Sequence, residues 1–563
     1  MPRKKVPTRK NDTVDVMNHD GSRIINLNKL QEHLQVISRH AATCQSCADN
    51  TLSGNEPIVL VGVKDHQGLC SILTSRCASC HEEFQFATSS RVQGLSGGQY
   101  WECNLAAVWG QMATGGGHAP LTESMAVLGL PSLTKKAFMA IEKRIGDWWR
   151  TLLNESMKQA GEEEKAIALS KDSRYDIPRI TVIVDGGWSK RAHKHSYNAK
   201  SGVGIIIGKE TGKILFMGVR NKYCAVCHNT SGGTIPEHTC FLNWDQSSSA
   251  METDIIVEGF CQSETQHGLH YAEFIGDGDS SVHPTLVRKV PYGTLIKKVE
   301  CANHAVKCFC GTLESLVLDK PSYKGRGKLT EAMRKRLTKS ACCAIIMRSQ
   351  ELNKVEAVKK LQRDLVNIPL HCFGCHSKCS PDLCKTAQKN QQQTQEQQEQ
   401  QQQQLPPTNM GAMANNTVED GTNDTIHNIT SGLNDVITTQ AQAWADATDN
   451  EGLDDTRSNF TTNLCESWMH IRTKFDGGKQ INRSQSGSWG GRCAGAGLRC
   501  NEGAGWGPSM WKTAVCTEPS DVFKLAAANA VKRTDNDRKR KASADAKLQR
   551  KKARYSTTSV DTA

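Results

Sequence analysis

Three acidic residues follow strand-like segments in a pattern that suits divalent-metal chemistry. Asp185 ends the apolar segment 179–185, while Asp277 and Asp279 lie in Gly-Asp-Gly-Asp-Ser-Ser directly after the strand pattern at 271–276. If the two strands are neighbours in one sheet, the carboxylates converge and repel each other unless a cation lies between them. Mg²⁺ or Mn²⁺ suits such oxygen ligands. Two ions about 3.5–4 Å apart can serve phosphodiester chemistry.

The alternative for each acidic motif is a turn. Asp-Gly after a strand is an ordinary turn signal, and either motif alone would more often mark a turn than a catalytic site. Their joint occurrence after two separate strands favours catalysis. That interpretation requires a third acid from elsewhere in the chain.

A second set of residues has the spacing of zinc ligands. Two Cys-x2-Cys knuckles separated by 29 residues form the pattern of a zinc ribbon, and they are Cys44, Cys47, Cys77 and Cys80. Three further groups also predict Zn²⁺ ligands: Cys224, Cys227, His238 and Cys240; His371, His376, Cys379 and Cys384; and the half-site Cys301 and His304.

Some alternatives remain open within these groups. Cys372 and Cys375 compete as ligands in the third group, and Cys308 or Cys310 is the candidate to complete the half-site. Any of these thiols could instead be a small buried hydrophobe. A Zn²⁺ ion closed by four protein ligands has no open position, so we expect these sites to be structural.

The elements that must position the acids form a recognisable order. Residues 179–300 contain three antiparallel strand patterns, a helical stretch near 249–264, a strand ending in the acids, and one more strand. This order predicts an α/β fold with a ribonuclease H-like catalytic core. A helical insertion interrupts the core, and small zinc-binding modules with a disordered linker and tails complete the fold class.

Composition places the positive charge at the chain ends. The 563 residues carry a net charge of +12. Residues 1–10 hold five basic groups, and 532–554 hold eleven against three acids. Such clusters are typical of nuclear-import or nucleic-acid-binding segments, and the alternative is a solvated tail. No apolar run reaches the ~18 residues of a bilayer span, and no secretory signal is visible, so we expect neither a membrane nor a secreted protein.

We expect eight segments along the chain. They are a basic disordered tail (1–20), a zinc-ribbon-like module (21–95), a helical segment (96–175), the ribonuclease H-like core with a Cys/His zinc insertion (176–320), a helical insertion with a Cys/His knuckle (321–385), a Gln-rich disordered linker (386–460), the C-terminal part of the catalytic domain (461–515) and a basic disordered tail (516–563).

The motifs together resemble one transposase family. The Asp-Gly-Gly-Trp that begins at Asp185, the segment Asn-Trp-Asp-Gln-Ser-Ser-Ser-Ala-Met-Glu, the Gly-Asp-Gly-Asp-Ser-Ser segment and the following Cys301-x2-His304 resemble the animal branch of the Mutator-like element transposases. The resemblance runs from about residue 23 to about 515. It implies an Asp-Asp-Glu triad that binds metals.

The resemblance also implies where the third acid lies. The family's glutamate occupies a helix after a long insertion, in an Asn-x-x-Glu-Ser context, and Asn463 to Ser467 matches this context with Glu466. Glu351 and Glu356 are the fallback candidates. The apolar stripe of this helix is expected at Leu464, Trp468, Ile471 and Phe475, with Glu466 roughly opposite.

Residues 121–149 could contact DNA. A helix pattern at 121–127, the turn Leu-Gly-Leu-Pro and a second pattern at 132–149 resemble a helix-turn-helix, with Ser132 as the N-cap. The alternative is a plain helical scaffold. We expect double-stranded DNA as the partner, namely transposon terminal repeats and target, bound by a homo-oligomer in the nucleus.

The resulting hypothesis is a Mutator-like DNA transposase. It would use Mg²⁺ to cleave phosphodiester bonds at transposon ends and transfer the strands into target DNA. One alternative is a domesticated transposase that binds DNA through its zinc modules without cleavage. The other is a different ribonuclease H-like nuclease that acts on RNA or repair intermediates.

Overall fold

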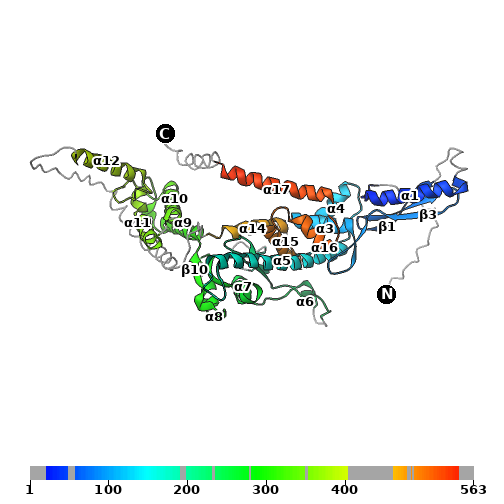
Figure 1. Ribbon diagram of the computed structural model, residues 1–563, viewed down its shortest axis with the longest axis horizontal. Coiled ribbons are helices and arrows are strands. Elements are labelled where there is room, and N and C mark those ends of the chain that lie inside the picture. Colours follow the sequence, from blue (N-terminus) through cyan, green and yellow to red (C-terminus); the bar gives the residue numbers. More distant parts are fainter. Residues whose placement is uncertain are drawn as a thin grey trace, which may run out of the picture.

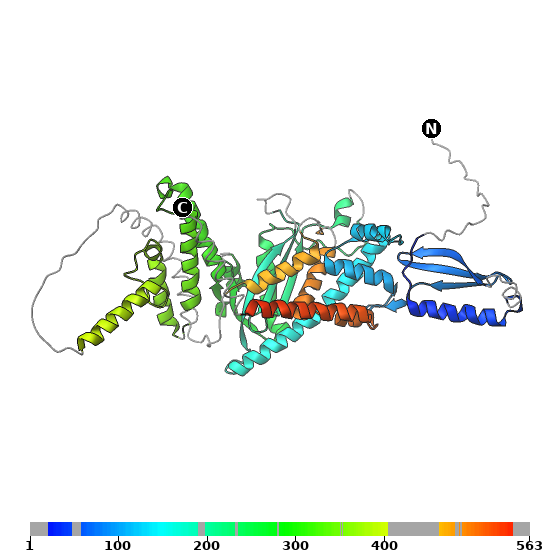
Figure 2. The ribbon, with the colours of Figure 1, turned by 90° about the horizontal axis from the view of Figure 1, so that it is seen from above.

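The computed structural model is elongated (Figure 1). A small N-terminal module lies at one end, a helical group at the other, and a sheet with its covering helices lies between them (Figures 1 and 2). The structure describes residues 21–47, 58–189, 198–230, 235–277, 281–348, 351, 353–402, 461–478, 483–484 and 487–543. The expected tail 1–20, Asp279 and most of the expected linker lie outside the described residues.

The N-terminal module pairs one helix with a small antiparallel sheet. Asn26 caps α1 (Leu27–Thr43) by accepting hydrogen bonds from the N–H groups of Asn28 and Lys29. The sheet has the order β1-β2-β3. Its strands, followed by a two-stranded ribbon, are β1 (Ile58–Gln67), β2 (Cys70–Cys77), β3 (Glu83–Ala87), β4 (Arg91–Gln93) and β5 (Gln99–Trp101).

Three helices follow the module: α3 (Glu102–Thr114), α4 (His118–Val127) and the 37-residue α5 (Lys135–Lys171). The expected N-cap Ser132 is wrong, because Thr134 accepts the capping bond from the N–H of Ala137 at 3.2 Å. Helix α5 buries Trp148 and Trp149 in the protein core. Its depth in the core favours the scaffold alternative over a base-reading helix.

The central sheet has five strands in the order β10-β9-β6-β7-β8. Strands β6, β7 and β8 pair antiparallel, while β9 runs parallel to both β6 and β10. This confirms the strand order expected from the sequence. The bounds are β6 (Arg179–Trp188), β7 (Ser201–Gly208), β8 (Ile214–Asn221), β9 (His270–Gly276) and β10 (Lys297–Glu300).

Helices cover both faces of the sheet. On one face α7 (Ala250–His267) approaches closely, because a Cβ added at Gly204 would lie only 2.8 Å from Cγ2 of Ile255. Helix α8 (Val282–Lys289) packs on α7 and on the 3₁₀ turn η1 (Gly293–Leu295), while the short α6 (Ala225–Asn229) follows β8. Because successive strand residues point to opposite faces, every second residue of these strands packs against the other face's helices, which are α5, α14 and α15.

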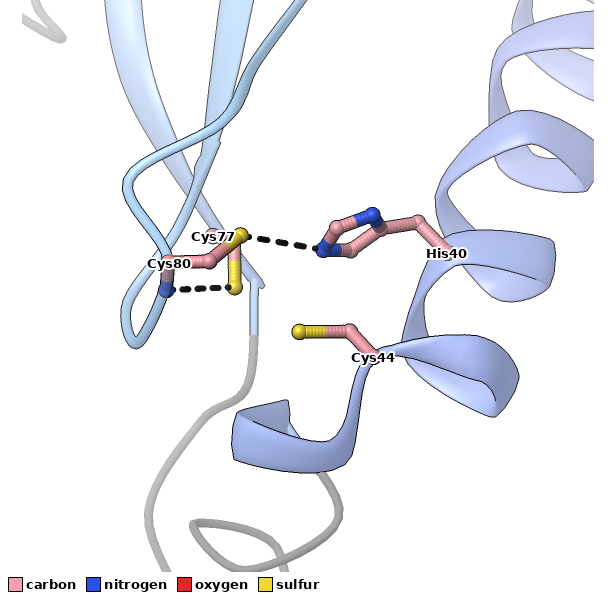
Figure 3. A group of neighbouring side chains, drawn as sticks. All are labelled: His40, Cys44, Cys77 and Cys80. Carbon is pink, nitrogen blue, oxygen red and sulfur yellow. Dashed lines mark hydrogen bonds between the residues drawn. The ribbon is translucent and has the colours of Figure 1, made fainter.

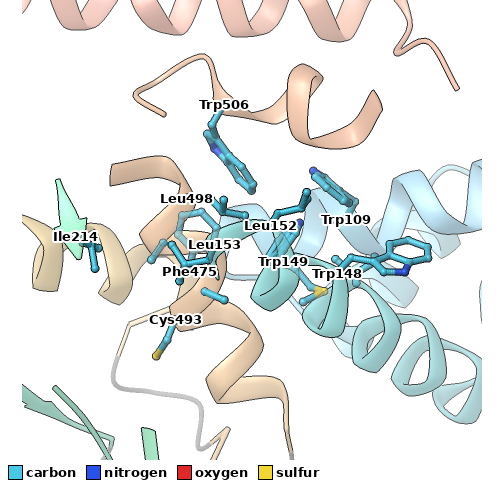
Figure 4. Close-up of a cluster of buried hydrophobic side chains, with 14 of the residues drawn as sticks. Trp109, Trp148, Trp149, Leu152, Leu153, Ile214, Phe475, Cys493, Leu498 and Trp506 are labelled. Carbon is cyan, nitrogen blue, oxygen red and sulfur yellow. The ribbon is translucent and has the colours of Figure 1, made fainter. Parts of the chain in front are cut away.

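The segment 461–515 completes the main core. It forms α14 (Asn463–Asp476), α15 (Ser488–Asn501) and α16 (Trp506–Val515). Figure 4 shows Trp506 and Phe475 from this segment gathered around Trp109 and Trp149. The ring centroids of Trp109 and Trp506 are 6.0 Å apart. The core therefore joins side chains from two distant parts of the chain.

A buried arginine fixes the same junction. Arg492 on α15 is fully buried and donates hydrogen bonds to the carbonyls of Met112, Phe475 and Gly116. Its guanidinium also contacts the carboxylate of Glu142 on α5 at 2.7 Å. A buried charge is tolerated when it is paired and hydrogen-bonded, so this network ties α15 to the α3–α4 connection.

The helical group at the far end has its own core of Leu313, Leu337 and Leu361. It begins at 302, directly after β10, and not at 321 as expected. It consists of α9 (Ala302–Asp319), η2 (Pro321–Tyr323), α10 (Glu331–Arg348), α11 (Lys354–Cys372) and α12 (Lys385–Gln402). The last of these places 386–402, expected within a disordered linker, in a helix.

The C-terminal region differs from the expected disordered tail. Residues 521–542 form α17 (Asp521–Ala542), whose start is capped by Ser520 through a 3.3 Å hydrogen bond from the N–H of Phe523. Among the described helices none combines the length and apolar character that a bilayer span requires.

Candidate active site and metal centres

Asp185 and Asp277 lie at matching positions on neighbouring strands. The last registered pair between the parallel strands β6 and β9 is Ile183 with Ile275. Asp185 and Asp277 each follow two residues later, so both acids lie at the carboxyl edge of the sheet. The N–H of Gly186 donates a 2.8 Å hydrogen bond to Oδ1 of Asp185. This bond orients the carboxylate within the edge.

The surroundings of Asp185 disfavour its negative charge. Burial raises its pKa to about 7, and the charges of Asp277 and Glu466 act in the same direction. The Gly186 N–H and the Lys307 ammonium oppose the shift. A carboxylate held in such a field binds either a proton or a cation at neutral pH.

Helix α14 brings Glu466 to this edge. The thiol of Cys465 donates to the carbonyl of Ile183 at 3.7 Å, which attaches the first turn of α14 to β6. Glu466 itself is 46% exposed, and Oε1 lies 3.5 Å from Nζ of Lys307 on α9. The charge of Glu466 therefore acts on Asp185, while the Glu466 side chain stays open to solvent.

The buried stripe of α14 differs in phase from the expected one. Trp468 and Phe475 are buried as expected, but Leu464 is exposed and Cys465 takes its place in the core. The stripe packs on β6, α3 and α15. If Leu464 had been buried as expected, Glu466 would point further from the sheet. Burial of Cys465 in its place rotates α14 so that Glu466 lies nearer to the sheet.

The fallback glutamates have other partners. Glu351 contacts Arg348 and Lys360, and Glu356 contacts Arg363 at 3.1 Å. All of these ion pairs lie within the helical group that follows β10. Asp279 lies outside the described residues.

Within the described parts of the chain, three clusters of His and Cys side chains could hold a metal ion, with the donor atoms of each within 4.8 Å of one another. They are His40, Cys44, Cys77 and Cys80; Cys224, Cys227, His238 and Cys240; and His371, His376, Cys379 and Cys384. Mixed nitrogen and sulfur donors in fours suit tetrahedral Zn²⁺.

The first cluster includes a histidine that the sequence interpretation missed. Figure 3 shows His40 and Cys44 on α1 facing Cys77 and Cys80 at the end of the sheet. Nε2 of His40 lies 3.5 Å from Sγ of Cys80, and its Nδ1 lies 3.2 Å from a carboxylate oxygen of Glu82. A carboxylate behind the second ring nitrogen is the usual support of a metal-ligating histidine.

Cys47, the expected fourth ligand, stays close to this cluster. Its Sγ lies 3.1 Å from Sγ of Cys77. Burial opposes ionisation of Cys77, but hydrogen bonds from the Cys80 N–H and from the Cys47 and His40 side chains lower its pKa to about 5. A thiolate is the form that binds a metal. Five donors therefore surround a site that needs four.

The second and third clusters have the donor sets expected from their spacing. Nε2 of His238 lies 3.3 Å from Sγ of both Cys224 and Cys227, and its Nδ1 contacts the carbonyl of Pro236 at 2.9 Å. In the third cluster Nδ1 of His371 lies 3.4 Å from Sγ of Cys379. Cys372 and Cys375, which competed by spacing, contact Ser340 and Ser377.

Cys301 and His304 do not join a third donor in the described residues. Instead the buried Sγ of Cys301 accepts a 3.3 Å hydrogen bond from the N–H of Thr462, the residue before α14. Cys301 thus contacts the start of the helix that carries Glu466. Its observed contacts are those of a support for α14.

The architecture is that of an α/β protein with a mixed sheet, acids at the sheet edge and clusters able to hold metal ions. The family model of the Mutator-like transposases matches residues 21–385, so the chain belongs to this family. Membership implies DNA binding and the use of a divalent metal. No curated protein matches the chain.

Proposed function

We propose that this protein is an Asp-Asp-Glu DNA transposase with a ribonuclease H-like core. Its support is the strand order β10-β9-β6-β7-β8, with acids at the carboxyl ends of two adjacent parallel strands. The observation that carries the proposal is the register of β6 and β9, which puts Asp185 and Asp277 at matching positions, and the charge of Glu466 acting on Asp185 supports it. In this proposal the three acids, which come from distant parts of the chain, form one site at this edge of the sheet.

Asp185, Asp277 and Glu466 are the residues that would hold Mg²⁺ or Mn²⁺. The bound ions would activate the attacking oxygen and stabilise the leaving oxygen of a phosphodiester. The Gly186 N–H holds Asp185 in orientation, and Lys307 offsets the charge of Glu466 beside it. Water then cleaves at the element end, and the freed 3′-hydroxyl attacks target DNA without a covalent enzyme intermediate.

The three Cys/His clusters hold structural Zn²⁺ in this proposal. Each supplies four donors and leaves no open position for catalysis. Two of them hold together short loops, and the first closes α1 onto the sheet of the N-terminal module. Action in the nucleus and assembly as a homo-oligomer on DNA belong to the same proposal.

The test is cleavage of a duplex carrying the ends of the element. Asp185→Asn should lose Mg²⁺-dependent cleavage by at least about a hundredfold while DNA affinity stays within severalfold, because it removes a metal ligand and not a phosphate contact. Cleavage by this variant at the wild-type rate contradicts the site. Wild-type binding without cleavage in Mg²⁺ or Mn²⁺ supports the domesticated alternative.

A further inference from the structure

Helix α17 is firmly attached at its start. The Phe523 ring packs edge-on against Trp511 of α16, with centroids 6.4 Å apart. A Cβ added at Gly507 would lie 2.8 Å from this ring, so the glycine makes room for it. Before the helix, Glu518 pairs with Lys512 and Lys524. These contacts fix the direction in which α17 leaves the core.

The second half of α17 carries a concentrated positive charge. Beyond Val531 the helix holds six basic residues against Asp535 and Asp537, and all eight side chains are exposed. The basic residues, here called the basic end of α17, are Lys532, Arg533, Arg538, Lys539, Arg540 and Lys541. The ion pair of Arg540 with Asp537 is itself exposed, and such pairs contribute little.

The basic end of α17 lies level with the start of α14 along the long axis of the molecule (Figures 1 and 2). In Figure 1, α17 runs above α14 and α15, on the side away from α7 and α8. In both views its last turns end level with the start of α14, the helix that carries Glu466 (Figures 1 and 2). Along the long axis of the molecule, the positive charge therefore lies level with the first turn of α14, which carries Glu466.

We propose that the basic end of α17 binds the phosphate backbone of the DNA being cleaved. The inference rests on the proposed function, and it adds an arm outside the family match at 21–385. The acids at the sheet edge repel a phosphate backbone, and a cationic element that contacts the same DNA would offset that repulsion. Lysine and arginine contacts to phosphate give affinity without base specificity and set the position of the duplex.

The arrangement of charge on the helix fits a backbone contact. Lys532, Arg533, Lys539 and Arg540 stand at i, i+1, i+7 and i+8 and so share one face. Arg538 and Lys541 lie on the side shared with Phe523 and Val531. A phosphate chain that passes the end of the helix meets cations on both sides, whereas base reading would need polar groups aimed into a groove.

The test compares two variants that each lose four charges. In the arm variant Arg538, Lys539, Arg540 and Lys541 become Gln. In the control Lys222, Arg288, Lys289 and Lys297, which are exposed on other surfaces, become Gln. The arm variant should bind a random-sequence duplex about 10- to 100-fold more weakly near physiological salt, and its slope of log K against log salt should fall by roughly 2–4. The control should stay within threefold.

A third variant separates a positioned arm from a charged tail. Phe523→Ala keeps every charge but removes the anchor, so element-end cleavage should fall at least tenfold while random-duplex binding stays within threefold. If the arm variant binds and cleaves as the wild type does, or loses only nuclear entry, the inference is overturned and the segment is an import signal. If the wild-type chain itself neither binds nor cleaves DNA, the proposed function fails instead.

Discussion

Asp185 has an environment in which its proton competes with a cation. Its carboxylate is partly buried at the sheet edge, where burial and the charges of Asp277 and Glu466 raise its pKa to about 7. Among the acids of the sheet edge it is the one on which the other charges converge. Substitution of Asp185 should therefore change the pH dependence of stability as well as the cleavage rate.

Without Mg²⁺ or Mn²⁺, the Asp185 carboxyl should contribute more to stability as the pH falls from 8 to 5. The folded-state pKa of about 7 lies above the ordinary aspartate value of 3.8, so the folded chain binds this proton more tightly than the unfolded chain does. Asp185→Asn removes this dependence. Thermal melts without added Mg²⁺ or Mn²⁺, and without a chelator that would remove zinc, should show the variant above the wild type at pH 8, with the gap closing by pH 5.

The same melts contain a control for the cation. Mg²⁺ should raise the melting temperature of the wild type at pH 8 more than that of Asp185→Asn, because a ligand that binds only the folded state stabilises it. An equal rise in both proteins would contradict the assignment of Asp185 as a ligand.

Glu466 can be tested against a glutamate of similar exposure. Glu466→Gln should lose element-end cleavage as fully as Asp185→Asn, with folding and DNA affinity retained. Glu356, 45% exposed and paired with Arg363, is the matched control, and Glu356→Gln should stay within severalfold of wild type. If Glu356→Gln is inactive and Glu466→Gln is active, the third acid lies before residue 403 and the segment 461–515 is scaffold.

At the scale of elements, α1 and its C-cap supply two donors to the first His/Cys cluster at helical spacing. His40 lies in the last turn of α1, and Cys44, four residues later, is the C-cap whose N–H donates to the carbonyl of His40. Glu82 contacts the ring nitrogen that faces away from Cys80. The position of Cys47 after the helix leaves it beside Cys77, at the border of the site.

Zinc content should distinguish His40 from Cys47. The purified wild type should hold three Zn²⁺ per chain, one for each cluster. His40→Ala should hold two, whereas Cys47→Ser should keep three, by metal analysis after dialysis. His66→Ala, on β1 and bonded to Ser71, is the control and should also keep three. Loss of zinc in Cys47→Ser with retention in His40→Ala would restore the four-cysteine ribbon.

Strands and paired cysteines were predictable because their signals are local. The apolar segment that ends at Asp185 and the spacing of Cys224 and Cys227 each lie within a few residues. His40 escaped prediction because α1 was not recognised, and only the i, i+4 relation to Cys44 would have revealed it. The phase of α14 at Leu464 depends on tertiary packing that periodicity alone does not contain.

The helical state of α17 was missed for a similar reason. Its composition is polar and basic, which predicts a solvated tail. Helix formation here depends on a cap at Ser520 and on one aromatic anchor, Phe523. Neither signal stands out in a sequence window that contains so much charge.

At the scale of the whole molecule, the family match ends at residue 385 while the fold does not. Helices α14, α15 and α16 fill the core around Trp109 and Trp149. In a chain that ended before α14, Glu142 on α5 would lose Arg492, its buried partner. Removing one member of a buried ion pair costs about 3–5 kcal/mol.

A chain of residues 1–402 should therefore not fold stably alone. Co-expression with a separate chain of residues 461–543 should restore solubility and element-end cleavage, because the two parts meet through buried side chains. The companion chain with Arg492→Met should fail to rescue, and one with Lys512→Met, an exposed position, should succeed. A soluble, cooperatively melting 1–402 would show that the core does not need the later helices.

The packing of α14, α15 and α16 against α5 also affects how the protein is made. About 340 residues separate the end of α5 at Lys171 from the end of α16 at Val515, so roughly 20–70 s pass on the ribosome before the second can reach the first. Throughout that interval the nascent chain displays the indole rings of Trp109 and Trp149 without their cover. Its production should depend on chaperones that shield hydrophobic surface, and any premature stop before α14 should yield a product that the cell degrades.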